Sequence, residues 1–434
     1  MNTEIKEKLL ETLHNQNKHI LANVIEKNAD VSISSYSEKL WDYKATRPIE
    51  QALIDAFKKE FTRLDIKKET QEEIIDSISR TRSIQTAPHI GLHESSRMLM
   101  IHYLTTLGIN KDEWYVVGTF SGIPFSNDSY PASISFSKNH TFSDIFENED
   151  LYYTDAIKKQ KDRERDLPNE SYMRLSVAEP KDKNSIVYRS DTPKTYVDIY
   201  PHLDKKLRDS LVEPKLETSF TKTMLESNKN LISNIIHHKK IIFIDINEVI
   251  SNYLQIVLQD KEHFIYKIFF DEKMHRDMID TFSVHEHFFY YTEIETKKQH
   301  HAYIDNFLLK SKNLETKIQN ESLIKLLAET QLCPGIFIGF TALSFLNDFQ
   351  CFGSFKQIEY LTRYKKIWQE SNLLPVDISH VPTDSLTTGE LSDENLRFIT
   401  PIDIALGSEW QVDNNQTFGD IIEPMIPLLQ AFKN

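Results

Sequence analysis

Apolar residues recur at helical spacing in the first part of the chain. From Thr3 to Glu26, and again from Pro48 to Leu64, they follow one another three or four positions apart, which places them on one face of a helix. Residues 1–85 are therefore expected to form a helical N-terminal region. The proline of Thr86-Ala-Pro-His89 favours a first helical turn, and we expect a helix from there to Leu107.

Strand and helix patterns alternate further along the chain. Apolar runs typical of buried strands occur at Trp114–Phe120, Ile241–Asp245 and Phe264–Phe270. Helical patterns stand beside them, at Ser219–His238, Glu248–Gln259 and Glu272–Phe282. This alternation predicts an α/β fold with a mainly parallel, layered sheet.

A polar segment is expected to interrupt this α/β body. Residues 138–185 are charged and have no sustained period, which is typical of a surface excursion or a lid. The chain closes with an amphipathic helical pattern, IIEPMIPLLQAF. The expected order is a helical region, the first part of the body, the polar excursion, the second part of the body and a C-terminal extension: 1–85, 86–137, 138–185, 186–372 and 373–434.

Composition excludes several classes of function. The 434 residues include 65 acidic and 51 basic ones, and the net charge of −14 disfavours binding to nucleic acid. There are only ten glycines, and neither G-x-x-x-x-G-K-[ST] nor G-x-G-x-x-G occurs, so a P-loop NTPase or an ordinary dinucleotide enzyme is not expected. Met1–Leu10 lacks the apolar core of a signal peptide, and no apolar run is long enough to cross a bilayer. We expect a soluble, cytoplasmic protein with no membrane partner.

The most unusual local sequence is Gln85–Arg97, QTAPHIGLHESSR. A helix entrance exposes free amide groups, and this one could hold an anion, with Arg97 as a clamp and His89 as a base. His89 and His93 are four residues apart, so on a helix they would share one face and could bind a divalent metal. A hydrogen-bonded pair in a helix cap is the plainer interpretation of this spacing.

A second candidate follows the strand expected at Trp114–Phe120. Ligands of open α/β sheets bind at the carboxyl ends of the strands, so Asn127 and Asp128 could bind the amine or hydroxyl of a substrate. A turn held by side-chain hydrogen bonds to the backbone explains the same two residues equally well.

A third candidate is a histidine pair. On a strand, His285 and His287 face the same side, and Glu293 could complete a metal site with three ligands. The plainer interpretation is a polar strand end, because no common metal-site spacing is matched closely.

Two segments, taken in order, resemble the cysteine-adding enzymes of bacillithiol biosynthesis. Thr86-Ala-Pro-His-Ile-Gly-Leu, followed by a helix that ends Ile101-His-Tyr103, is similar to that family's T-G-Q-Q-x-G-L segment. Gly353-x-x-x-Gln-Ile-Glu359-Tyr360 is similar to its G-P-G-E-I-A-Y stretch. The chain departs from the family at His89, where the second Gln would stand, and in the loop Gly122–Asp128.

The resemblance implies a Rossmann-like α/β body that joins the amine of cysteine, or of another amino-acid-like substrate, to a carboxyl or sugar-derived acceptor. Carried over by position, the polar candidates are His89 and Glu359 as catalytic residues, beside Asp128, and Thr86, Gly91 and Tyr360 as substrate-binding residues, beside Arg97 and Asn127.

A ligase-like or condensing enzyme of small-molecule, secondary metabolism is therefore the favoured function. Two alternatives stay open: a metal-dependent hydrolase or oxygenase that uses the histidine clusters, and a non-catalytic adaptor that binds another protein. The sequence does not fix the cofactor or the source of activation. It also leaves the oligomeric state open, with a homodimer as one option.

Overall fold

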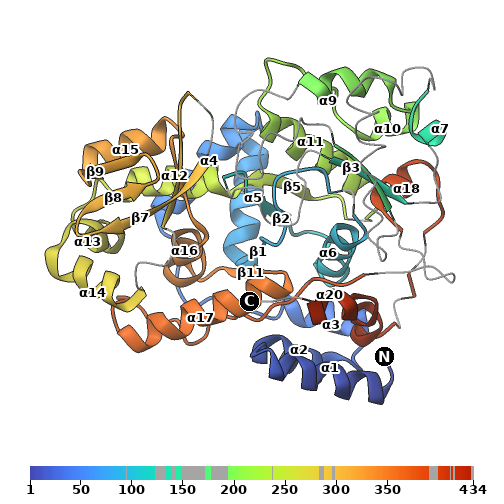
Figure 1. Ribbon diagram of the computed structural model, residues 1–434, viewed down its shortest axis with the longest axis horizontal. Coiled ribbons are helices and arrows are strands. Elements are labelled where there is room, and N and C mark those ends of the chain that lie inside the picture. Colours follow the sequence, from blue (N-terminus) through green and yellow to red (C-terminus); the bar gives the residue numbers. More distant parts are fainter. Residues whose placement is uncertain are drawn as a thin grey trace.

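The computed structural model shows a mixed α/β architecture (Figure 1). Two sheets lie among many helices, and a third, two-stranded sheet stands apart from them. The structure describes residues 1–93, 95–122, 133–137, 142–147, 172–176, 194–236, 238–282, 288–295, 299–390, 399–410, 412–413 and 416–431.

The N-terminal region is helical, as predicted from its apolar spacing. Its helices are α1 (Thr3–Asn15), α2 (His19–Asn28), α3 (Ile33–Leu40), α4 (Gln51–Arg63) and α5 (Lys68–Thr81). The pattern from Thr3 to Glu26 is divided between two helices because Asn17 adopts a left-handed conformation with φ of 57°. This region does not stand alone: α4 and α5 share a hydrophobic core with the central sheet.

The central sheet has four strands, all parallel, in the order β11–β1–β2–β5. Their bounds are β1 (Ser83–Gln85), β2 (Tyr115–Thr119), β5 (Ile241–Asp245) and β11 (Gln350–Phe352). The chain therefore builds the sheet outward from β1 through β2 to β5, and then returns to add β11 on the other side of β1. The strands expected at Trp114–Phe120 and Ile241–Asp245 are confirmed, as is a parallel sheet.

Both faces of this sheet are buried, which explains the apolar runs. In β5, Ile242 and Ile244 face a core that includes α4, α5, α12 (Ile246–Val257) and α17 (Phe355–Ser371). Ile241 and Phe243 face the opposite core, formed with α6 (Ser96–Leu107) and α11 (Phe220–Ser233). Side chains of a strand alternate between its faces, so a strand covered on both sides contains almost no polar position.

The helix expected to open at Thr86 begins ten residues later. Residues 86–90 instead continue as extended chain beside the end of β2, where Ile90 N donates to Phe120 O at 3.1 Å. The helix start is at Ser95, whose hydroxyl accepts from Met98 N at 3.3 Å. The expected helix start was wrong. A proline fits the first turn of a helix but does not fix its start, and here the side chain that caps the helix belongs to Ser95.

The strand expected at Phe264–Phe270 is also wrong, since these residues form helix α13 (Phe264–Phe270). A short apolar run does not distinguish a buried strand from a buried helix. His263 favours the helix here, because its ring nitrogen accepts from Ile265 N at 3.1 Å and caps the N-terminus of α13. The helices expected next to it are confirmed as α11, α12 and α14 (Glu272–Phe282).

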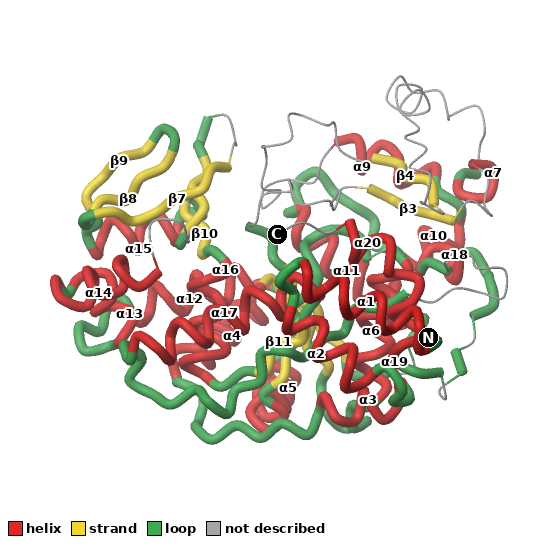
Figure 2. The backbone as a smooth tube through the Cα atoms, turned by 60° about the horizontal axis from the view of Figure 1, so that its bottom comes forward, coloured by secondary structure: helices red, strands yellow, loops and turns green. Residues whose placement is uncertain are grey.

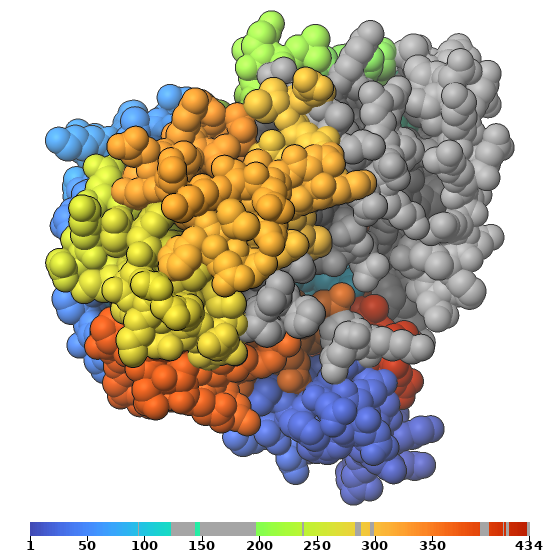
Figure 3. Space-filling view, turned by 60° about the vertical axis from the view of Figure 1, so that its left-hand side comes forward, coloured from blue at the N-terminus to red at the C-terminus, as the bar shows by residue number. Residues whose placement is uncertain are grey.

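A second sheet, antiparallel and five-stranded, was not anticipated. Its order is β10–β6–β7–β8–β9, with bounds β6 (Phe289–Thr292), β7 (Gln299–Asp305), β8 (Leu308–Ser311), β9 (Leu314–Lys317) and β10 (Leu332–Pro334). Helix α12 lies between the two sheets, and α15 (Asn320–Ala328) packs on it. Because of this sheet, the structure matches the expected parallel, layered fold only in part. In Figure 3 it forms one surface with α13, α14 and α17.

The remaining elements complete the ends and the periphery. They are β3 (Ser133–Ser137), β4 (Tyr172–Ser176), α7 (Phe142–Ile145), α9 (Lys194–Ile199), η2 (Tyr200–His202), α10 (Lys205–Ser210), α16 (Ile336–Phe340), η3 (Thr341–Leu346), α18 (Pro401–Ala405), α19 (Phe418–Ile422), η4 (Glu423–Met425) and α20 (Ile426–Ala431). The terminal helix is divided at its prolines. Most of the polar segment 138–185 lies outside the described residues.

The two ends of the chain meet in a third core. Helices α1 to α3 pack there with α19 and α20, and the Met1 ammonium group pairs with Asp420 (Figure 2). In the described ranges no helix is long and apolar enough to cross a membrane. Cys333 and Cys351 are buried, and neither is part of a disulfide.

Candidate functional site

The carboxyl ends of β1 and β11 meet at the point where the strand order reverses. Thr86 follows β1, and both its backbone N–H and its hydroxyl donate to Phe352 O, each at 3.0 Å. Gln357 on α17 donates from Nε2 to the same hydroxyl at 2.7 Å. Ligands of open α/β sheets bind in the crevice at such a reversal. We call the carboxyl ends of β1, β2 and β11, with the side chains upon them, the edge site.

His89 lies at the edge site as a neutral imidazole. Its backbone pairs with Phe120 at the end of β2, and its ring nitrogens make no hydrogen bond with any described residue. Burial, and then the ammonium group of Lys356 on α17, lower the pKa of His89 to about 4. At neutral pH the ring therefore carries a free lone pair close to a positive charge.

Aromatic side chains connect His89 with Tyr360. The His89 ring centroid is 6.4 Å from that of Phe120, Phe120 is 6.0 Å from Phe340, and Phe340 is 5.8 Å from Tyr360. Burial, followed by Tyr364, Cys351 and Tyr290, raises the pKa of Tyr360 well above its ordinary value. Tyr360 thus contacts the edge site through Phe340 and stays protonated, as a hydrogen-bond donor.

Gly91 and His93 hold the loop that carries His89. Gly91 has φ of 147°, a conformation that side-chain-bearing residues rarely adopt, and its carbonyl accepts from Asn228 Nδ2 at 2.7 Å. The His93 backbone N–H donates to Asn228 Oδ1 at 2.8 Å. Both residues therefore fix the path of the loop.

Both nitrogens of the His93 ring take part in a buried chain of hydrogen bonds. His93 Nδ1 lies 2.8 Å from His102 Nε2, and His102 Nδ1 lies 2.9 Å from the Tyr115 hydroxyl. His93 Nε2 approaches His89 O at 3.4 Å. Burial lowers the pKa of His93 to about 3 and that of His102 well below its ordinary value. Both nitrogens of His93 are engaged, which leaves neither for a metal ion.

Glu359 and Arg97 are engaged elsewhere. Glu359 Oε1 accepts from Leu21 N at 2.9 Å and so caps the start of α2, on the side of α17 that faces away from Thr86. Arg97 Nε lies 3.4 Å from a carboxylate oxygen of Glu390, a buried residue that also accepts from Ser96 Oγ at 3.3 Å. The structure does not bring these two predicted site residues to His89.

Four of the predicted site residues lie outside the described residues: Asn127, Asp128, His285 and His287. Among the residues that are described, no group of three or more His, Cys, Asp and Glu side chains could hold a metal ion.

Two edge-site residues were missed by the sequence analysis. Gln357 and Lys356 lie in the segment whose resemblance was noted, yet neither was singled out. The signal was present, because both stand in the first turn of the helix that follows a buried strand. The same rule would have found Asp245, which ends β5 and accepts from Ser121 Oγ at 2.5 Å.

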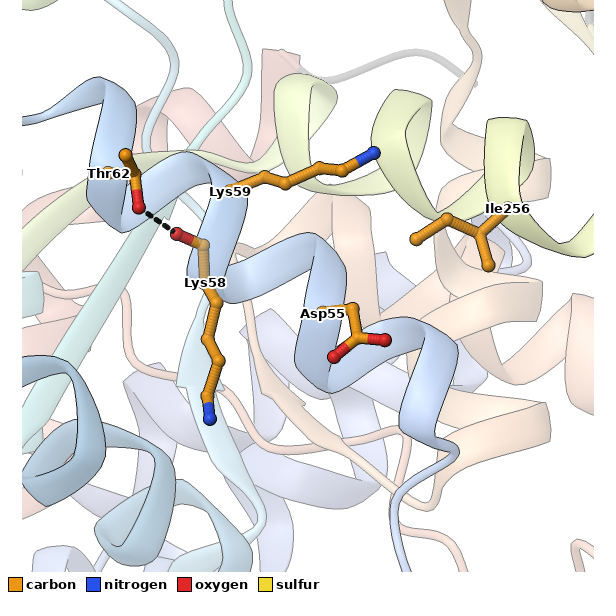
Figure 4. A pocket seen from close by; sticks show the side chains of 5 residues that line it. All are labelled: Asp55, Lys58, Lys59, Thr62 and Ile256. Carbon is orange, nitrogen blue, oxygen red and sulfur yellow. Dashed lines mark hydrogen bonds between the residues drawn. The ribbon is translucent and has the colours of Figure 1, made fainter. Parts of the chain in front are cut away.

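A separate depression lies on the outer surface between α4 and α12 (Figure 4). It has a volume of about 570 Å³ and is lined by Asp55, Lys58, Lys59, Thr62 and Ile256. Lys58 turns away and pairs with Glu72 at 2.9 Å. The depression is shallow, and no residue of the edge site lines it.

Comparison with protein-family models and with curated proteins finds no match to this chain. Its function must therefore be argued from the geometry of the edge site.

Proposed function

We propose that the chain is a Rossmann-like, ligase-like enzyme of small-molecule metabolism, which forms a C–N bond to an amino-acid-like substrate such as cysteine. The observation that carries the proposal is the position of His89, after β1 and beside the end of β2, and of Lys356, in the first turn of α17 after β11: both lie next to the point where the strand order reverses. The net charge of −14 and the lack of phosphate-binding glycine motifs favour a small polar substrate over nucleic acid.

Each group at the edge site has a use in this reaction. The Lys356 ammonium group binds the substrate carboxylate, and the neutral His89 ring accepts a hydrogen bond from its amine. A carboxylate beside Lys356 offsets the positive charge that lowers the His89 pKa, so substrate binding makes the imidazole a stronger base.

The proposed step uses a second substrate whose carboxyl carries a leaving group. The amine nitrogen forms a bond to the carbonyl carbon, the leaving group departs with its electron pair, and His89 accepts the proton that the amine loses. Tyr360, which stays protonated, donates to the developing oxyanion.

The proposal is tested by product formation. Purified protein is incubated with L-cysteine and a panel of activated carboxylic acids, and the adducts are measured by mass spectrometry. His89→Ala is expected to reduce turnover about 100-fold or more, since general bases contribute on that order. Lys356→Met is expected to raise KM about tenfold.

Two exposed residues provide matched controls. His14→Ala removes an exposed histidine, and Lys366→Met removes an exposed lysine from the same helix as Lys356. Both are expected to keep wild-type turnover. Equal turnover in His89→Ala and His14→Ala would overturn the proposal.

A further inference from the structure

Gln299 has a buried acceptor that no described residue satisfies. It is the first residue of β7, is 3% exposed, and its Nε2 donates to Gly122 O at 2.7 Å. Its Oε1 is fully buried and has no hydrogen-bond partner among the residues that the structure describes. Buried acceptors are almost always paired, because leaving one unmet costs free energy. A donor from outside the chain is the simplest partner for this oxygen.

The Gln299 side chain lies at the same edge of the parallel sheet as His89. Gly122 comes two residues after Phe120, whose backbone pairs with His89, and its N–H donates to Asn247 Oδ1 at 2.9 Å. A Cβ at Gly122 would fall 1.8 Å from Cys333 Sγ, so strand β10 lies directly against this point. The antiparallel sheet therefore borders the edge site on the side of β2.

Tyr290 lies on the same face of the antiparallel sheet as Gln299. In the register of β6 and β7, Thr292 is opposite Gln299 and Tyr290 is opposite His301, so the four residues share one face. Tyr290 also pairs with Cys333 on β10, the residue whose sulfur lies against Gly122. The Tyr290 hydroxyl makes no hydrogen bond to another described residue. Tyr290 thus lies beside the point where the Gln299 side chain contacts Gly122.

We propose that Gln299 Oε1 and the Tyr290 hydroxyl form a subsite for the primary ammonium group of the ligand. An ammonium group brings three donors and no acceptor, which matches an unmet amide oxygen and a phenol oxygen. The aromatic rings around Phe340 add a surface that attracts cations. A carboxylate or phosphate would place an acceptor against the Gln299 oxygen, and only the Tyr290 hydroxyl could donate to it. The inference rests on the proposed function only in assigning this ammonium group to the amino-acid-like substrate.

Two matched ligands test the subsite. L-cysteine and 3-mercaptopropionate differ in the amino group alone, and their binding to the full chain is measured by titration calorimetry. Wild type is expected to bind L-cysteine about tenfold more tightly, the value of one good hydrogen bond. Gln299→Met, of similar size, is expected to abolish this preference while leaving the affinity for 3-mercaptopropionate within about twofold. An unchanged preference in Gln299→Met would overturn the subsite.

A simpler probe separates this inference from the proposed function. Methylammonium is titrated into protein labelled with ¹⁵N at the glutamine amides, and the Gln299 signal is identified by its loss in Gln299→Met. A shift of that signal on titration supports the subsite. If methylammonium shifts it while neither thiol ligand binds, the subsite stands and the amino-acid-like substrate is wrong. If the signal does not move, the subsite is wrong.

A second variant guards against a folding defect. Gln299→Glu keeps the length of the side chain and an acceptor oxygen, but it loses the Nε2 donor to Gly122 O and adds a negative charge. Because a carboxylate binds an ammonium group more strongly than an amide oxygen does, Gln299→Glu is expected to bind methylammonium where Gln299→Met does not. A merely structural role predicts that Gln299→Met and Gln299→Glu weaken binding alike, which would contradict the proposal. Urea unfolding of both variants establishes that they are folded.

Discussion

Gln357 Nε2 and Thr86 Oγ1 form a 2.7 Å hydrogen bond between residues that are 271 positions apart in the chain. The bond joins the segment after β1 to the helix after β11, at the reversal of strand order. Both residues are buried, and this is the shortest hydrogen bond that the Gln357 amide makes; its approaches to Cys351 O and Phe352 O are each 3.4 Å. The bond therefore fixes the relative position of the two elements that carry His89 and Lys356.

Thr86→Val tests this bond. The substitution keeps the shape of the side chain but leaves the Gln357 amide without its hydroxyl acceptor, so we expect a loss of about 1–3 kcal/mol in the free energy of unfolding. Urea denaturation measures it. Thr12→Val, on α1, is the control and should change stability by less than about 0.5 kcal/mol. Equal effects of the two substitutions would show that the bond contributes nothing.

The His89 pKa is expected to lie near 4, well below its ordinary value of 6.5. Burial and Lys356 both disfavour the protonated ring, so Lys356→Met should raise this pKa, and Lys366→Met should leave it unchanged. Titration of the imidazole signals by NMR gives the values. A wild-type pKa above 6 would contradict the proposed environment of His89.

Asp348 is expected to make stability depend on acid pH. Burial alone would raise its pKa, but hydrogen bonds from Arg47, His380 and the Thr46 backbone lower it to about 2, below the ordinary value of 3.8. The stabilisation is therefore complete above about pH 4 and is lost as pH falls towards 2.

Asp348→Asn measures this contribution. It should lower the free energy of unfolding by about 1–2 kcal/mol at neutral pH, and the difference from wild type should shrink between pH 4 and pH 2. Asp30→Asn, at an exposed position, is the control. A difference that stays constant over this range would mean that the carboxylate of Asp348 is not the source of the stabilisation.

The His93–His102–Tyr115 chain predicts a second pH effect with the same sign. The folded pKa values of both histidines lie below 6.5, so the unfolded state binds protons first, and stability falls as pH decreases below about 6.5. Tyr115→Phe removes the hydroxyl that is bonded to His102 Nδ1 and should cost about 1–3 kcal/mol. Unfolding at pH 7 and pH 5, with proton uptake measured by calorimetry, tests both statements. Stability that is equal at the two pH values would contradict them.

Glu359→Gln separates a structural role from a catalytic one. Since Glu359 caps α2, the substitution should lower the free energy of unfolding by about 0.5–1 kcal/mol and leave turnover unchanged. Stability and product formation are measured on the same preparation. A large loss of turnover with unchanged stability would restore Glu359 as a catalytic residue.

The sequence predicted the strands of the central sheet that are buried on both faces. The run Ile241–Asp245 was predicted to be a strand buried on two faces, and it is one. Phe264–Phe270 is equally apolar, but it forms a helix that is capped by His263. The spacing of apolar residues gives no information about such a cap. The path of residues 86–95 depends on Phe120, a tertiary neighbour 31 residues from His89.

The edge site was predictable in part. Thr86, His89 and Tyr360 were named through the family resemblance, and His89 also through its unusual local sequence. The structure places Thr86 and His89 at one edge of the sheet, and Tyr360 contacts Phe340 beside it. The role of Glu359 could not be read from the sequence, because it depends on contact with α2, more than 300 residues away. Gln299 could not be identified from the sequence for a similar reason. Only the packed structure shows that its Oε1 is buried with no hydrogen-bond partner among the described residues.

Hydrogen exchange with and without L-cysteine tests the central claim that the ligand binds at the edge site. Peptides that cover residues 86–93 and 353–360 should exchange more slowly when L-cysteine is bound, and this protection should be lost in Lys356→Met but retained in Lys366→Met. Protection confined to α4 and α12, around the depression in Figure 4, or no protection near His89 at saturating ligand, would contradict the account.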